Sequence, residues 1–144
     1  MKRLFIIQIL AALLTLLWVY TAFSKITDVA EFRWQLQNQV FSPAQATALF
    51  YLIPSAEILA SILLCSKKTR LYGFLLSLLL MISFTLYTGL ILFNYYPRVP
   101  CSCGGVLAFL DWNSHFIFNL FFTAISGVGI FMIKKPGIME IKKQ

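Results

Sequence analysis

Four long apolar stretches constrain this chain more than any other feature of its sequence. These stretches cover approximately residues 4–23, 46–65, 71–92 and 115–133. A helix of about 20 residues is about 30 Å long, which matches the hydrocarbon thickness of a bilayer. Because lipid offers no hydrogen-bond partners, such stretches satisfy their backbone groups within helices. The sequence therefore predicts an all-α membrane protein, in which residues 1–144 form a single membrane domain with four transmembrane helices.

Composition supports the bilayer as the solvent of these stretches. Hydrophobic residues make up 60% of the chain and charged residues only 12%, whereas soluble domains are about half apolar and about a quarter charged. The formal net charge of +7 comes from basic residues in short tracts between the apolar stretches. No basic surface with interleaved aromatic residues is present, so nucleic acid is not an expected partner and the bilayer is.

The basic tracts also set the expected orientation. Nine of the 12 Lys and Arg residues lie before the first stretch, in residues 67–70 or after the fourth stretch. Because positively charged loops stay in the cytoplasm, both termini are expected there, and residues 25–45 and 97–114 are expected outside. Short connections favour an antiparallel four-helix bundle. We expect this bundle to be a multi-pass protein of a bacterial inner (cytoplasmic) membrane, with its outer segments facing the periplasm.

Two segments allow more than one interpretation. Residues 4–23 could be a signal peptide, because residues 22–24 loosely resemble a cleavage site, but the apolar stretch is longer than a usual signal-peptide core. Residues 25–40 carry apolar side chains at spacings of three and four among charged ones. This spacing predicts an amphipathic helix on the outer membrane surface, and a plain connector is the alternative.

Cys101 and Cys103 are the most informative residues outside the apolar stretches. They lie in the expected outer loop 97–111, where two prolines and two adjacent glycines oppose a regular helix. Disulfides persist on that side of the membrane. A bond between residues two apart closes a small ring, and strained disulfides are reduced more readily. The pattern favours thiol–disulfide exchange, and a static structural disulfide is the second hypothesis.

His115 is the only histidine, and it opens the fourth stretch on the same outer side. It could accept a proton during thiol exchange, hydrogen-bond a quinone, or simply bind a backbone carbonyl at the interface. Asn119 follows one turn later on the same helix face, and Trp112 is typical of a membrane interface. A third hypothesis joins Cys101, Cys103 and His115 as copper(I) or zinc ligands. No fourth ligand for a closed zinc site is evident, so a metal site is not predicted.

Glu57 is the exceptional residue of the second stretch. A carboxylate at that depth is costly unless it faces the bundle interior and finds a partner there. Lys25, at the outer end of the first stretch, is the expected partner. This polar pair could be structural, or it could relay protons or contact a ligand. Cys65 falls at the cytoplasmic end of the same stretch, away from the other two cysteines, and is expected to be a small buried apolar residue.

The chain resembles the MauE/DoxX family of small membrane proteins over most of its length. The segments that carry the resemblance are Phe23-Ser24-Lys25-Ile26, Pro54-Ser55-Ala56-Glu57, Cys101-Ser102-Cys103-Gly104-Gly105 and Trp112-Asn113-Ser114-His115, with Asn119 beyond them. The resemblance implies that Cys101 and Cys103 are a redox pair and that Lys25 and Glu57 are an intramembrane polar pair. Gly104 stands where an aromatic residue is expected, which leaves the subfamily open.

The two branches of that family imply different functions. The MauE branch is associated with the maturation of periplasmic proteins that need disulfides, beside a thioredoxin-like partner. The DoxX branch is linked to quinone-dependent sulfur oxidation. A quinone is therefore the candidate cofactor, although no motif in the sequence identifies one outright.

The leading functional hypothesis is a membrane thiol–disulfide redox protein, a possible oxidoreductase. It would exchange electrons with an extracytoplasmic thioredoxin-like protein, and pass them to a quinone, in disulfide formation or protein maturation. One alternative is a non-enzymatic membrane subunit or anchor with a structural disulfide. Another is a metal-handling protein that uses the two outer cysteines and His115.

Overall fold

The structure, a computed structural model, describes residues 2–96 and 111–134 of the chain. The described residues form the helices α1 (Lys2–Thr27), α2 (Val29–Gln37), α3 (Pro43–Cys65), α4 (Arg70–Leu92) and α5 (Trp112–Lys134). Four of these helices, all except α2, are long and apolar enough to cross a membrane. The prediction of an all-α protein with four such helices is therefore confirmed.

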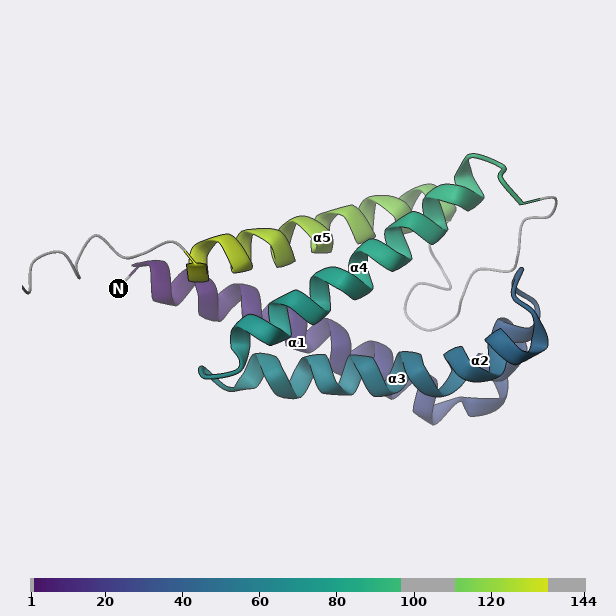
Figure 1. The fold of residues 1–144 in the computed structure, drawn as a ribbon, viewed down its shortest axis with the longest axis horizontal. Coiled ribbons are helices and arrows are strands. Elements are labelled where there is room, and N and C mark those ends of the chain that lie inside the picture. The colour runs from purple at the N-terminus through teal and green to yellow at the C-terminus, as the bar shows by residue number, and fades with distance from the viewer. Residues whose placement is uncertain (1, 97–110, 135–144) are drawn as a thin grey trace, which may run out of the picture.

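The four long helices form two pairs that diverge toward one end of the molecule. α1 packs along α3, and α4 packs along α5, and Figure 1 shows the second pair rising away from the first toward the right. We call the left-hand end of this view, which holds Lys2, the turn at residues 66–69 and Lys134, the narrow end. The opposite end, which holds α2, is the wide end (Figure 1). Both ends of the described chain thus meet at the narrow end.

Basic side chains stabilise the helix ends at the narrow end. The Arg3 guanidinium donates to the carbonyl oxygen of Met132, at 2.8 Å from Nε, near the end of α5. Arg70 Nε donates to the carbonyl oxygen of Leu64 over 3.2 Å, near the end of α3. Cations suit these positions because the last carbonyls of a helix lack partners and carry partial negative charge. The basic tracts that predict the membrane orientation therefore also stabilise the ends of α3 and α5.

The apolar core follows the bundle axis from the narrow end. Leu14, Trp18 and Phe74 are fully buried in it. The Trp18 indole, on α1, donates to the Ser77 hydroxyl of α4 over 2.8 Å, so its buried N–H is satisfied. Small residues then allow close helix approach, as is common in membranes. A Cβ at Gly129 of α5, for example, would lie 2.2 Å from the Phe74 ring.

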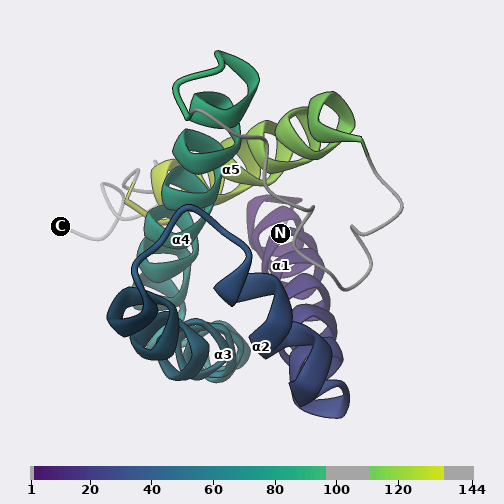
Figure 2. The same cartoon turned by 90° about the vertical axis from the view of Figure 1, so that its right-hand side faces the viewer.

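α2 caps the wide end beside α1 and α3 (Figure 2). Its first turn is capped by the Asp28 carboxylate, which accepts from the Glu31 N–H over 3.1 Å. Phe32 and Leu36 are buried against α3, whereas Trp34 is half exposed. Within the segment predicted at 25–40, residues 29–37 form a helix of their own, residues 25–27 belong to the end of α1, and residues 38–40 are not helical.

α3 begins at Pro43, three residues before the predicted start of the second span. The Ser42 hydroxyl accepts from the Gln45 N–H, and the Gln45 side chain accepts from the Ser42 N–H. This reciprocal capping satisfies backbone donors outside the apolar stretch, so the helix extends beyond the hydropathy boundary.

Gly129 and Gly127 of α5 offer a matched test of the close packing at the narrow end. Gly129→Ala should lower the free energy of unfolding by about 1–3 kcal/mol, because the added methyl overpacks against the buried Phe74 ring. Gly127→Ala should leave stability equal or higher, since no described atom lies within 4 Å of its Cβ position. Thermal unfolding in detergent micelles measures both, and equal losses would contradict the packing described.

Candidate functional site

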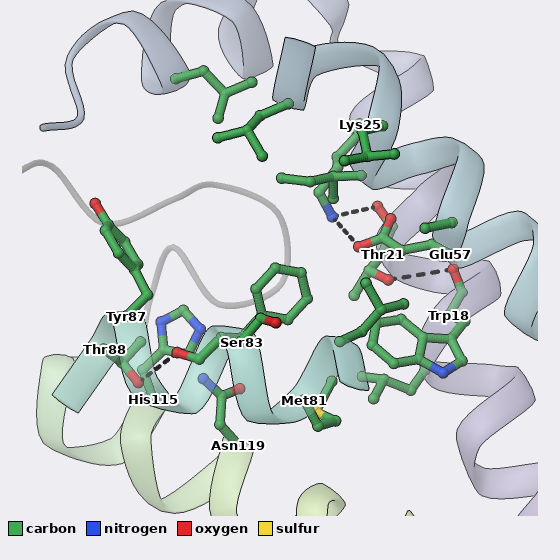
Figure 3. A pocket seen from close by; sticks show the side chains of 18 of the residues that line it. Trp18, Thr21, Lys25, Glu57, Met81, Ser83, Tyr87, Thr88, His115 and Asn119 are labelled. Carbon is green, nitrogen blue, oxygen red and sulfur yellow. Dashed lines mark hydrogen bonds and ion pairs between the residues drawn. The ribbon is translucent and has the colours of Figure 1, made fainter. Parts of the chain in front are cut away.

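A cavity of about 410 Å³ lies between the diverging helix pairs, toward the wide end. Each of the described helices contributes to its walls, which are mostly apolar. Its polar lining comes from Thr21, Ser24, Lys25, Glu57, Ser83, Tyr87, Thr88, His115 and Asn119. Figure 3 shows the side chains around this space. The volume is in the range of small-molecule sites, which are typically apolar with a few placed polar groups.

Lys25 and Glu57 form an ion pair across α1 and α3. Lys25 Nζ lies 2.8 Å from Glu57 Oε1, and the two side chains are 15% and 1% exposed. Lys25 Nζ also donates to the Thr21 carbonyl oxygen over 3.1 Å. The Phe32 ring lies 5.7 Å from the same ammonium, as in a cation–π contact. The contact expected between Lys25 and Glu57 is therefore present, and the ammonium is well supplied with partners.

Three buried polar atoms at this cavity have no hydrogen-bond partner among the described residues. They are Glu57 Oε2, His115 Nδ1 and Asn119 Nδ2. Their side chains are all more than nine-tenths buried, and all three residues line the same cavity. Most buried polar groups in proteins are hydrogen-bonded, so three such atoms around one cavity require an explanation.

His115 and Asn119 face the ion pair across the cavity. Figure 3 shows the two α5 side chains on one side and Lys25 with Glu57 on the other, with Met81 between them at its floor. The His115 ring lies nearly parallel to the Trp112 ring, with an interplanar angle of 12° and a centroid distance of 6.2 Å. The expectation that His115 and Asn119 share a helix face agrees with this arrangement.

Asp111 fixes the first turn of α5, which carries Trp112 and His115. Its carboxylate accepts hydrogen bonds from the side chain and backbone of Ser114, and these hold the pKa of Asp111 below its usual value. Its carbonyl oxygen accepts from the His115 N–H over 2.9 Å. The start of α5, and with it the position of His115, is therefore set locally.

The cysteines fall into two groups. Cys101 and Cys103 lie outside the described residues, as does most of the loop predicted at 97–111. Cys65 is exposed on the surface of the bundle, so the prediction that it is buried is wrong. The buried face of α3 includes Glu57, Ala60 and Leu64. Because each residue turns the helix by about 100°, the residue after Leu64 points away from that face.

Metal binding draws no support from the described part of the chain. Its His, Cys, Asp and Glu side chains include no group of three or more that could hold an ion. Cys101 and Cys103, the other ligands of that hypothesis, lie outside the described residues.

Sequence reasoning missed the contribution of α4 to the cavity. Ser83, Tyr87 and Thr88 line it from that helix. The Tyr87 hydroxyl also donates to the Gln39 side-chain oxygen, beyond the end of α2. Their spacing of four and five within an apolar stretch was the available signal, because polar side chains of a spanning helix tend to face the bundle interior.

Comparison with known proteins identifies one relationship. The family model described as methylamine utilisation protein MauE matches residues 3–132. That range contains Lys25, Glu57, Cys101, Cys103 and the first turns of α5. No curated protein and no solved structure matches the chain significantly.

The ion pair can be tested by a double-mutant cycle. Glu57→Leu should lower the free energy of unfolding by about 3 kcal/mol, because it leaves the buried Lys25 ammonium without its counter-charge. Lys25→Met with Glu57→Leu should recover most of that loss, since neither charge is then buried alone. Denaturant unfolding in micelles of the two single variants, Glu57→Leu and Lys25→Met, and of the double variant gives the coupling energy. Additive losses in the double variant would show that the contact contributes nothing.

Proposed function

The chain belongs to the MauE family, whose model matches it over residues 3–132, and from this premise we propose that it is a membrane thiol–disulfide redox protein. Cys101 and Cys103 exchange electrons with a thioredoxin-like protein outside the cytoplasm. The observation that carries the proposal is the Cys-Ser-Cys motif in the segment that joins α4 to α5. α4 ends and α5 begins at the wide end (Figure 1).

The charge distribution supports an extracytoplasmic position for the cysteine pair. Lys2, Arg3, Arg70 and Lys134 lie at the narrow end, where α1 begins, α4 begins and α5 ends. The positive-inside rule places that end in the cytoplasm and the wide end outside. In a bacterial inner membrane the wide end then faces the periplasm, where disulfides persist. The exchange partner is accordingly a periplasmic protein.

The exchange proceeds by two thiolate attacks. A partner thiolate attacks one sulfur of the Cys101–Cys103 disulfide, whose S–S bond breaks as a mixed disulfide forms. The second partner thiolate attacks that bond, so the partner leaves oxidised and both cysteines take up the two electrons as thiols. The reverse sequence reduces the partner. A bound quinone would supply the acceptor for those two electrons and two protons.

His115 is the proposed proton acceptor for this exchange. It lies in the first turn of α5, four residues after Asp111, and is buried at the wide end of the bundle. A neutral imidazole there can take a thiol proton and return it. The proposed client is a protein that needs disulfides for its maturation.

Thiol trapping tests the redox proposal. Single variants Cys101→Ser and Cys103→Ser are made in a Cys65→Ala background, since Cys65 is exposed and would also react. A mass-tagged maleimide after acid quenching should show a mixture of oxidised and reduced wild-type protein, and one single variant should trap a mixed disulfide. A pair that is always oxidised and never traps a partner would establish a structural disulfide. A pair shielded until a chelator is added would establish metal binding.

The orientation has a separate test with single cysteines introduced into a chain in which Cys65, Cys101 and Cys103 are Ala. A membrane-impermeant maleimide added to spheroplasts should label Asn38→Cys at the wide end and not Lys67→Cys at the narrow end. Both should be labelled after the membrane is permeabilised. The reverse pattern would place the cysteine loop in the cytoplasm.

A further inference from the structure

The three unpartnered atoms at the cavity define what a bound molecule must offer. Glu57 Oε2 is a carboxylate oxygen and accepts hydrogen bonds, whereas Asn119 Nδ2 donates them. His115 Nδ1 can do either, according to its tautomer. A complementary molecule therefore places a donor against Glu57 and an acceptor against α5, on the opposite wall (Figure 3).

The charge and the walls of the cavity restrict the molecule further. Lys25 already balances Glu57, with its Nζ at 2.8 Å from Oε1, so the site favours a neutral molecule. The remaining lining is mostly apolar and includes the rings of Trp18 and Phe84. Aromatic walls suit a flat, ring-sized apolar body. Apolar walls also disfavour filling the whole cavity with water.

Two residues of the cavity wall are also exposed. They are Leu52 of α3 and Ser83 of α4. α3 and α4 are joined at the narrow end and separate toward the wide end (Figure 1). The exposed parts of spanning helices face hydrocarbon, so a lipid-soluble molecule can enter between them without crossing water.

We propose that this cavity binds a neutral, lipid-soluble quinol, and that it binds the quinol in preference to the matching quinone. One quinol hydroxyl donates to Glu57 Oε2, and the oxygen at the other end of the ring accepts from Asn119 Nδ2. A quinone has only acceptors, so its carbonyl oxygen would oppose Glu57 Oε2 without a proton between them. The selectivity follows from the position of Lys25, which binds Oε1 and leaves Oε2 without a hydrogen-bond partner among the described residues.

This inference deepens the proposed function and rests on it for the redox role of the ligand, but the binding itself does not need the cysteines. Binding is therefore measured on the variant with Cys65, Cys101 and Cys103 changed to Ala, which cannot exchange electrons through thiols. The measurement is isothermal titration calorimetry in nanodiscs, with a short-chain benzoquinol and the matching benzoquinone as probes. Protein-free nanodiscs correct for partition into lipid.

The quinol should bind about tenfold or more tightly than the quinone, as expected for a hydrogen bond to a charged acceptor. Glu57→Gln should reduce or reverse this preference. Its side-chain oxygen can still accept from Lys25, while its amide can donate to a quinone carbonyl. Equal affinities for the two probes, or a preference unchanged by Glu57→Gln, would overturn the proposal.

Asn119→Leu provides a second readout that a purely structural residue would not give. It should weaken binding of both probes by about 3- to 10-fold. It should also raise the thermal stability of the ligand-free protein, since it removes a buried amide N–H that has no partner in the described part of the chain. Ser126→Ala is the matched control on α5, because Ser126 is fully buried, donates to the Phe122 carbonyl oxygen and lies away from the cavity. If Asn119→Leu left binding unchanged, the assignment would fail.

Discussion

The ion pair between Lys25 and Glu57 is the constraint on which the wide end of the structure depends. Two opposite charges cannot lie separately within hydrocarbon at an acceptable free energy, so they meet in the interior. This requirement fixes the rotation of α3, because the face that carries Glu57 must point inward along with Ala60 and Leu64. It also ties α3 to the C-terminal end of α1. Once α1 and α3 are held in this way, α2 has a fixed place to pack, with Phe32 against the Lys25 ammonium.

The narrow end of the bundle contributes close packing, and the wide end contains the cavity. At the narrow end, glycines permit close helix contact and basic side chains cap the carbonyls of α3 and α5. At the wide end the helix pairs separate, and buried polar atoms at the cavity have no partner among the described residues. Unsatisfied groups of this kind reduce stability by about 1–3 kcal/mol each. The closely packed narrow end can tolerate that loss, so the wide end is free to present hydrogen-bonding groups to a ligand.

Hydropathy and helical periodicity predict the four spans and the polar contacts of this structure. They do not predict the exposure of Cys65 or the cavity. The four spans followed from the length of the apolar stretches, and the contact of Glu57 with Lys25 followed from the high free energy of an unpaired charge in lipid. The shared face of His115 and Asn119 needed only a spacing of four. The exposure of Cys65 depends on how α3 is rotated, and single-residue hydrophobicity does not specify that. The cavity depends on the divergence of the two helix pairs. These pairs approach closely only toward the narrow end, where a Cβ at Gly73 of α4 would lie 2.8 Å from the Leu64 backbone nitrogen of α3.

The arrangement of the unpartnered atoms links the cavity to the chemistry proposed for the segment between α4 and α5. Among the described residues, an acceptor without a donor lies on α3, and a donor without an acceptor lies on α5. The ion pair holds α3, and Asp111 holds the start of α5. A molecule between the two helices could satisfy both atoms. Because the segment with Cys101 and Cys103 leaves α4 and enters α5 at this same end, such a molecule would lie within the half of the bundle that carries the proposed exchange site.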